Sequence, residues 1–225
     1  MTERIKIEPK PIIIHKGRLS FFKGNEPAYK TNKLGQPIKV DPRTGKEKKP
    51  QFSWTWLLDP SEKQAQETIK EIKAEAARQL DLYFGVTDPS QRKDKWPQDN
   101  KQTGTKGVYL CFGNGNDLNK VYEGYADRFY IKVASIDRPV LGNSKGGVTA
   151  LGDKEHPYGG CYARGRVGLY VFNNESAGVN ANPWSAFFLK DGTGFGGGQQ
   201  RSAEDEYAAF GDAPSQEAVE DPFAT

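Results

Sequence analysis

The 225-residue sequence predicts a mainly β fold: a five-stranded antiparallel barrel with one principal helix, long loops and a disordered acidic C-terminal tail. At least five short segments alternate apolar and polar residues, as half-buried strands do. Only one segment has helical periodicity, so strands and helices do not alternate as a parallel sheet requires. An antiparallel barrel is the simplest way to bury five amphipathic strands.

The first two strands are expected at residues 17–24 (GRLSFFKG) and 51–58 (QFSWTWLL). The second is rich in aromatic residues, which favour strands. Residues 25–50 between them are rich in Pro, Gly, Lys and Asn, and DPRTGKEKKP at 41–50 indicates an exposed basic loop. Trp54 and Trp56 share one face, where rings belong to a core more often than to a binding surface.

The clearest helix is expected at residues 59–85. Asp59 is the expected N-cap, Pro60 suits the first helical position, Glu62 completes a capping box and Gly85 is the expected C-cap. One apolar stripe recurs at steps of three and four: Ala65, Ile69, Ile72, Ala76, Leu80 and Tyr83. The stripe favours a structural role for this helix.

Further strands are expected at residues 107–115, 125–137 and 159–172. In the second of these, Phe129, Ile131 and Val133 take the side opposite to Arg128, Tyr130 and Lys132, because successive side chains point to opposite faces. Residues 86–107 and 138–160 are expected to be a polar linker and a glycine-rich loop. NNESAGVNANP (173–183) is expected to be a loop, followed by a short apolar element.

The sequence lacks the signatures of several protein classes. No run of 18 apolar residues is present, so no membrane helix is expected. Two histidines and two cysteines do not make a zinc site, and no P-loop or nucleophile elbow occurs. We therefore expect no catalytic residue, no metal, no cofactor and no enzymatic activity. Cys111 and Cys161 fit a reduced cytoplasm better than a disulfide scaffold.

Charge is distributed unevenly along the chain. Residues 1–201 carry a net charge of +10, and residues 202–225 carry seven acids, no bases and a net charge of −7. A basic body suggests a polyanionic partner, and a terminal acidic block is typical of an interaction tail. We therefore divide the chain into a nucleic-acid-binding domain at 1–201 and an acidic tail at 202–225.

The segment GGCYARGRVGLYVF (159–172) supplies the main functional signal. As a strand, it has one small aliphatic face and one face of arginines and rings. Arginine pairs with phosphate and stacks on planar groups, and aromatic rings stack on unpaired bases, so this face matches single-stranded nucleic acid. The predicted DNA-binding residues are Tyr162, Arg164, Arg166, Tyr170, Phe172, Arg128, Tyr130, Lys132, Lys16, Arg18 and Trp54. The alternative is a merely soluble outer strand face, with the tyrosines packed beneath a loop or the helix.

The acidic tail is expected to compete with nucleic acid for the basic body. Its carboxylates and rings imitate phosphates and bases, and a tail displaced by DNA is free to bind proteins. The residues assigned to this role are Glu204, Asp205, Glu206, Glu220, Asp221 and Phe223. A simple solubilising tail is the alternative.

Three stretches together resemble the OB-fold single-stranded DNA-binding proteins of tailed bacteriophages, a family long catalogued as a domain of unknown function. They are GRLSFF near the start, GGCYARGRVGLYVFNN (159–174) and LKDGTGFGGGQQRSAEDEYAAF (189–210). The resemblance covers roughly residues 12–210 and implies an OB-type barrel that coats single strands in phage replication and recombination. Related proteins carry an acidic tail that ends in an aromatic residue, whereas here Phe223 is followed by Ala224 and Thr225.

The function predicted on these grounds is binding of single-stranded DNA with little sequence preference. The expected partners are single-stranded DNA, double-stranded DNA once the tail is removed, and replication or recombination proteins recruited by the tail. No membrane is involved, and the expected location is the cytoplasm of the infected bacterial host. The alternatives are an adaptor that binds acidic peptides and an accessory subunit of a phage nuclease or recombinase.

Overall fold

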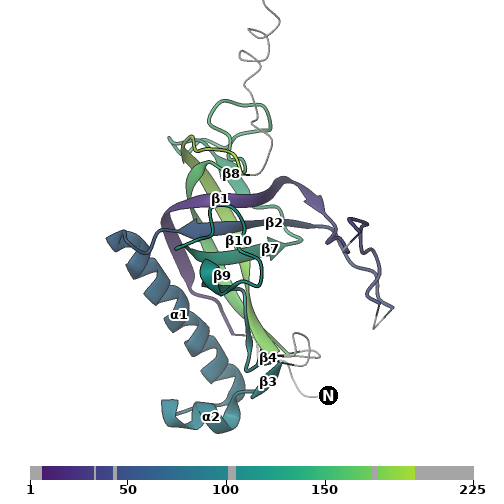
Figure 1. The fold of residues 1–225 in the computed structure, drawn as a ribbon, viewed down its shortest axis with the longest axis vertical. Coiled ribbons are helices and arrows are strands. Elements are labelled where there is room, and N and C mark those ends of the chain that lie inside the picture. The colour runs from purple at the N-terminus through teal and green to yellow at the C-terminus, as the bar shows by residue number, and fades with distance from the viewer. Residues whose placement is uncertain (1–6, 33, 43–44, 101–104, 174–176, 196–225) are drawn as a thin grey trace, which may run out of the picture.

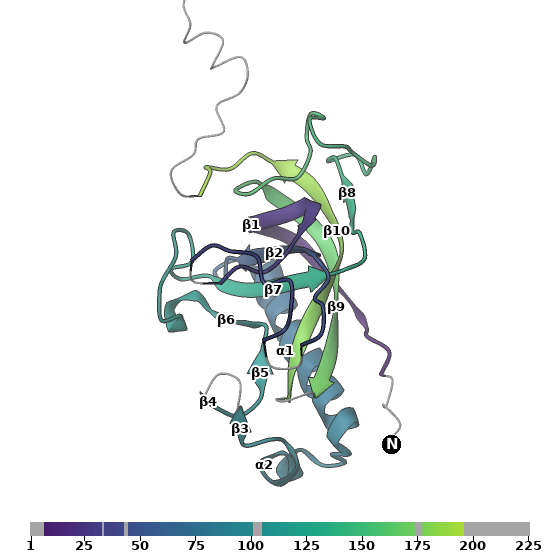
Figure 2. The ribbon, with the colours of Figure 1, turned by 90° about the vertical axis from the view of Figure 1, so that its right-hand side faces the viewer.

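The computed structural model describes residues 7–32, 34–42, 45–100, 105–173 and 177–195. One strongly curved sheet dominates it, and a long helix lies against one flank of that sheet (Figures 1 and 2). The strand order is β5-β10-β9-β1-β2-β7-β6, with β8 also paired to β10. The predicted mainly β barrel with one principal helix is therefore confirmed.

Five long strands make the barrel: β1 (Pro11–Ala28), β2 (Gln51–Leu58), β7 (Phe129–Ser135), β9 (Tyr162–Asn173) and β10 (Ala177–Lys190). Neighbours in the run β10-β9-β1-β2-β7 pair antiparallel, and β7 also contacts β10, which nearly closes the barrel. The predicted antiparallel pairing of the five barrel strands is confirmed, and two additional short strands add parallel pairs. The short strands β5 (Tyr109–Leu110) and β8 (Val140–Gly142) both pair parallel to β10.

Smaller elements fill the connections. Strand β6 (Phe112–Asn114) extends the sheet beside β7, and β3 (Asp99–Asn100) pairs with β4 (Thr105–Lys106) in a separate ribbon. The predicted polar linker also contains the short helix α2 (Arg92–Lys95), preceded by a 3₁₀ turn at Pro89–Gln91; a second 3₁₀ turn lies at Gly115–Asp117.

The prediction of a loop at 173–183 is wrong, because β10 begins at Ala177. Small residues, Asn and Pro give this stretch weak strand propensity. Pairing with β9 nevertheless holds it extended, with Val179 opposite Val171 and Ala181 opposite Leu169. Tertiary pairing has overridden local propensity here.

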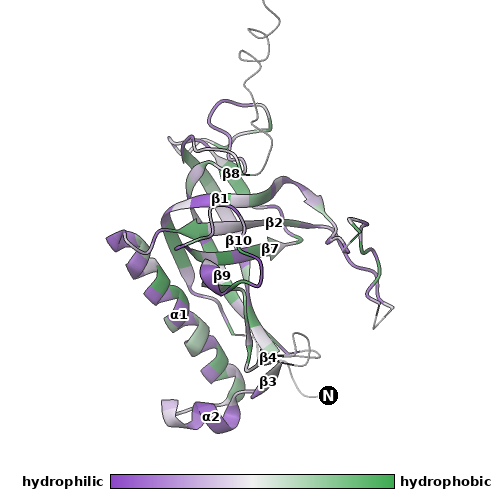
Figure 3. Cartoon of the chain, in the orientation of Figure 1, coloured by the Kyte–Doolittle hydropathy of each residue, from purple (hydrophilic) through white to green (hydrophobic). Residues whose placement is uncertain are grey.

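The core follows the alternation of the strands. Inward-facing residues include Ile12 and Ile14 of β1, Trp54 and Trp56 of β2, and Ile131 of β7, all at most 2% exposed. The two indoles meet edge to face with centroids 6.2 Å apart. Figure 3 shows the strands carrying hydrophobic residues, while α2 is hydrophilic. Large rings thus fill the barrel interior.

Helix α1 (Lys63–Phe84) packs on β1 and β9 through the predicted stripe, with Ala65, Ile72, Ala76 and Leu80 buried. Gly85 takes a left-handed conformation (φ 64°) and ends the helix as expected. The start differs from the prediction: Glu62 is the N-cap residue and forms no side-chain cap bond, while Asp59 accepts hydrogen bonds from Ser61 in the preceding turn.

The helix face next to that stripe is partly buried rather than fully solvated. Arg78 forms an ion pair with the buried Glu75 at 2.6 Å. Gln79 donates a hydrogen bond to the Leu169 carbonyl of β9 at 3.2 Å. These polar groups therefore fix the helix to the sheet.

His156 fastens the glycine-rich loop to β1. Its Nε2 lies 2.5 Å from Asn25 Oδ1, an acceptor, so this nitrogen carries the proton and Nδ1 accepts from the Thr149 hydroxyl at 2.8 Å. Burial lowers the pKa of His156 below its usual value of 6.5. The neutral imidazole is thus the form that the fold stabilises.

Replacing Gly165 should destabilise the barrel. A Cβ at this position would clash with the Ser185 carbonyl oxygen and lie 2.9 Å from the Trp56 ring. We expect Gly165→Ala to cost about 1–3 kcal/mol of unfolding free energy, the usual cost of overpacking, measured by urea denaturation. Gly159→Ala is the matched control, because its added methyl would meet nothing closer than 3.7 Å. Equal stabilities of the two variants would contradict this account.

Acidification should release the His156 contact. A histidine whose pKa is lowered by folding contributes stability above pH 6.5, and that contribution is lost as the pH falls through the folded-state pKa. The difference in melting temperature between the natural chain and His156→Gln should therefore be largest near pH 7.5 and shrink toward pH 5. A difference that stays constant over this range would show that the proton on His156 is irrelevant to stability.

Candidate nucleic-acid interface

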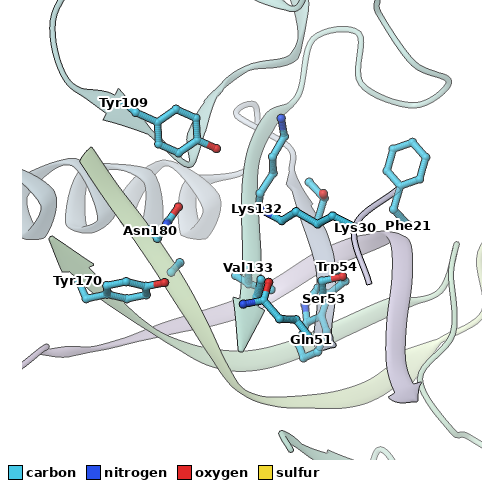
Figure 4. A pocket seen from close by; sticks show the side chains of 13 residues that line it. Phe21, Lys30, Gln51, Ser53, Trp54, Tyr109, Lys132, Val133, Tyr170 and Asn180 are labelled. Atoms are coloured by element: carbon cyan, nitrogen blue, oxygen red, sulfur yellow. The ribbon is translucent and has the colours of Figure 1, made fainter. Parts of the chain in front are cut away.

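A groove crosses the outer surface of β2 and β7. Its cavity is about 280 Å³ and its floor is formed by those two strands. We define this central groove by the side chains that give it chemical character: Phe21, Lys30, Tyr109, Lys132, Tyr170 and Asn180. In Figure 4 the two tyrosines and Asn180 lie on one side, Phe21 and Lys30 lie on the other, and Lys132 stands between them.

Strand alternation places the cation of β7 in this groove. Phe129, Ile131 and Val133 point into the core as predicted, so Tyr130 and Lys132 point outward. Partial desolvation by the surrounding protein lowers the pKa of Lys132, and the charge on nearby Lys30 lowers it further. The Lys132 ammonium lies 5.1 Å from the Tyr130 ring, so cation and ring form one unit.

The extended ends of β9 and β10 form an arm that bounds the groove. Pairing between β1 and β9 ends at Gly168, so Tyr170 lies where β9 pairs with β10 alone, opposite Asn180. Burial raises the pKa of Tyr170, and the Asn180 side chain shares a hydrogen bond with it. Burial raises the pKa of Tyr109 to about 12. Both hydroxyls therefore stay protonated near neutral pH and can donate hydrogen bonds.

Phe21 is a feature of the groove that the sequence-based interpretation missed. Its backbone has φ 49°, rare for a bulky residue, and lies where the register of β1 with β2 shifts. Phe22 packs on Trp54, while the Phe21 ring is 57% exposed and meets Tyr122 edge to face at 5.2 Å. The Phe-Phe pair in a strand was the available signal, since alternation must turn one ring outward.

Arg164 and Arg166 lie on a different surface. Both are exposed on β9, beside a cavity of about 350 Å³ on the barrel exterior. We define this outer cleft by Ile13, His15, Arg164, Arg166 and Phe187. In the described part of the chain, neither guanidinium forms an ion pair with a carboxylate.

The strand itself explains why the predicted surface is divided. Gly168 interrupts the series between Arg166 and Tyr170, and a Cβ there would lie 2.5 Å from the Trp184 ring. Trp184 therefore covers this position, with the Arg166 guanidinium 5.3 Å from its ring. Tyr170 falls in the central groove, and Phe172 packs against Tyr109 with centroids 6.0 Å apart. Residues on one face of β9 thus line two separate surfaces, with Arg164 and Arg166 at the outer cleft and Tyr170 in the central groove.

Three predicted cations are engaged by the protein itself. Lys16 pairs with Glu62 at 2.5 Å, and Arg128 pairs with Asp59 at 3.2 Å. Arg18 donates hydrogen bonds to the carbonyls of Gly160 and Thr193 and lies under the Phe195 ring, 3.8 Å from its centroid. These contacts occupy the three side chains, and none of the three lines the groove.

Trp54 requires a correction. Its ring is only 2% exposed and packs against Phe22 and Trp56, so it contributes to the floor beneath the groove and offers no free face for stacking. Tyr162 is half-buried outside the groove, with the Lys190 ammonium 4.9 Å from its ring. The predicted tail residues, Glu204 to Phe223, lie outside the described residues.

The described residues contain no cluster of three or more histidine, cysteine or acidic side chains placed to hold a metal ion. The same part of the chain has no helix with the length and hydropathy needed to cross a membrane. Cys111 and Cys161 are buried free thiols, and burial raises the pKa of both. Neither thiol lines the central groove or the outer cleft.

Comparison with known proteins gives a consistent result. A family model described as "Enterobacter phage Enc34, ssDNA-binding protein" matches residues 10–221. The solved structure of the single-stranded DNA-binding protein from bacteriophage Enc34 in complex with ssDNA is similar, with a TM-score of 0.56 at 18% identity over 83% of this chain and 89% of that one. The single-stranded DNA-binding protein gp2.5 of bacteriophage T7 gives a TM-score of 0.51 at 13% identity, over 93% and 98% of the two chains. These structures share the fold.

A curated relative adds similarity at the sequence level. Putative protein p50 of Acyrthosiphon pisum secondary endosymbiont phage 1 is 33% identical over 97 residues. The match covers 43% of this chain, and the chain spans about half the length of that relative.

Proposed function

The chain belongs to the Enc34 single-stranded DNA-binding protein family, and from this premise we propose that it binds single-stranded DNA with little sequence preference during phage DNA replication and recombination. The observation that carries the proposal is the central groove, where Lys132 stands between the exposed Phe21 ring and the Tyr109 and Tyr170 hydroxyls. An unpaired strand offers phosphates and open base faces, and this groove presents a partner for each. We propose that the protein acts by binding and not by catalysis.

The groove offers groups that bind any single strand, and few groups that distinguish one base from another. Lys132 and Lys30 are placed to attract phosphates, and Phe21 offers a face on which any base can stack, worth about 1–3 kcal/mol per base. The Tyr109 and Tyr170 hydroxyls can donate to phosphate or to base oxygens. Asn180 already shares a hydrogen bond with Tyr170, which leaves few groups to read a base edge. Binding with little sequence preference follows.

We also propose a role for residues 202–225. Seven acids on this segment oppose a body of net charge +10 and weaken its attraction for DNA. DNA displaces the segment, which then recruits replication or recombination proteins, and its removal extends binding to double-stranded DNA. The site of action in this proposal is the cytoplasm of the infected host.

Removing the groove cation and one groove ring should weaken DNA binding strongly. We expect Lys132→Ala with Tyr170→Ala to lower affinity for oligo-dT at least ten-fold and to reduce the salt slope by about one, because one phosphate contact is lost. Fluorescence anisotropy over a salt series measures both quantities. Lys63→Ala with Lys70→Ala on α1 is the control; it removes one positive charge more than the groove pair and should nevertheless change affinity little. If the control pair loses as much affinity as the groove pair, DNA lies elsewhere.

A chain that ends at Arg201 should bind oligo-dT more tightly than the full chain at low salt. The gain should disappear at high salt, because screening removes the effect of the seven acids. A full-length variant with these acids changed to Asn and Gln should behave like the truncated chain. Tight binding by the truncated chain alone would show that length, and not charge, is responsible.

A further inference from the structure

Two exposed aromatic rings meet at one edge of the central groove. Phe21 is 57% exposed and Tyr122 is 42% exposed, and their rings lie with centroids 5.2 Å apart and planes at 86° to each other. We call this pair the aromatic corner. Figure 4 shows Phe21 on the side of the groove opposite the two tyrosines, so a strand that crosses the groove leaves it over this corner.

A buried ring supports the aromatic corner from beneath. Tyr125 is 1% exposed, and its ring centroid lies 6.2 Å from that of Phe21 and 5.7 Å from that of Tyr122. Its side chain also shares hydrogen bonds with Ser20 of β1 and Thr55 of β2. The loop that carries both tyrosines is therefore fastened to the barrel wall.

Further contacts brace the same loop. The Asn116 side chain donates to Asp127 Oδ1 at 2.9 Å and accepts from the Asp127 amide at 3.0 Å, which closes the loop near its base. Between them, Gly124 has φ 77° and lies against the Phe195 ring, where a Cβ would clash. The other ring of the corner stands on a strand residue with positive φ. Two rings held exposed on a braced loop and at a strained position indicate a binding role.

The charges of the loop favour a base over a phosphate as the ligand of the aromatic corner. Lys120 lies 5.4 Å from the Tyr122 ring, but the loop also carries Asp117, Glu123 and Asp127. The acids outnumber the lysine, so the loop as a whole does not attract phosphate. An unpaired base needs no charge to bind here, because every base has a face that can stack on an aromatic ring.

We propose that the aromatic corner binds two neighbouring bases of the single strand, one stacked on Phe21 and the next on Tyr122, an inference that rests on the proposed function. Because the ring planes are nearly perpendicular, bases stacked on them cannot remain stacked on each other. The strand therefore turns as it leaves the groove and loses the stacking between these two bases. Adenines stack on each other more strongly than thymines do, so the corner makes the protein favour thymine-rich strands without reading a base edge.

The test compares oligo-dT with oligo-dA of equal length by fluorescence anisotropy. The natural chain should bind oligo-dT more tightly. Tyr122→Ala should lower affinity for oligo-dT at least five-fold, as expected for the loss of one stacked base, and should reduce the ratio of the two affinities. The salt slope should stay unchanged, because no phosphate contact is removed. Tyr122→Phe keeps the ring and should bind both strands as the natural chain does.

Tyr83 on α1 offers a matched control. It forms a similar edge-to-face pair with Phe84, with centroids 5.0 Å apart, and it does not line the central groove. Tyr83→Ala should change neither the affinity for oligo-dT nor the ratio of the two affinities. Tyr122→Leu keeps an apolar side chain but has no ring, and it should lose as much affinity as Tyr122→Ala. Melting temperatures confirm that each variant is folded.

Three results would overturn the proposal. Unchanged oligo-dT affinity in Tyr122→Ala, with loss in the Lys132→Ala, Tyr170→Ala pair, would remove the aromatic corner and leave the proposed function intact. Lower affinity with an unchanged ratio would show that the two bases are not turned apart. Full affinity in Tyr122→Leu would show that apolar packing, and not stacking, is what matters. Failure of the natural chain to bind oligo-dT would instead overturn the proposed function, and the corner with it.

Discussion

The structure depends on the burial of large rings inside a small barrel. Trp54 and Trp56 of β2 point into the barrel and fill its interior. The Trp56 ring requires glycine at position 165 of β9, because any side chain there would meet this ring. Because strands alternate, every residue next to an inward ring must face outward. The chemistry of the two outer surfaces is therefore tied to the packing of the core. Lys132 faces the groove because Ile131 and Val133 are needed inside.

The pattern of neighbouring residues was sufficient to predict the elements in which apolar residues recur at a strict period. The alternation of β7, the stripe on α1 and the glycine at its C-terminus are properties of neighbouring residues, and the structure reproduces them. The stretch 177–183 was missed, because its strand conformation comes from pairing with β9. Helix α1 begins later than its capping signals indicate, since Asp59 bonds to Ser61 in the preceding turn.

The central groove could be predicted only in part. Lys132 and Tyr170, which line it, were among the predicted residues because arginines, lysines and rings alternate along two strands. Phe21, Lys30, Tyr109 and Asn180 join them from other parts of the chain, and no local pattern in the sequence links these positions. The division between groove and outer cleft has the same origin: Gly168 and the overlying Trp184 break a surface that alternation alone makes continuous. No local pattern predicts the ion pairs that Lys16 and Arg128 form with Glu62 and Asp59, which lie just before α1.

The arm formed by β9 and β10 has a mechanical consequence. Beyond Gly168 it has lost β1 as a neighbour, while β5 pairs with it and the Gln79 side chain donates to the Leu169 carbonyl. The Cys111 amide also donates to the Val179 carbonyl of the arm, and the Cys111 carbonyl accepts from the Lys132 amide of β7. The spacing between Tyr170 and Lys132 is thus tied to the backbone of Cys111, which links the arm to β7. A change of backbone position at Cys111 would therefore alter the aperture offered to a ligand, although its own thiol lines neither the groove nor the cleft.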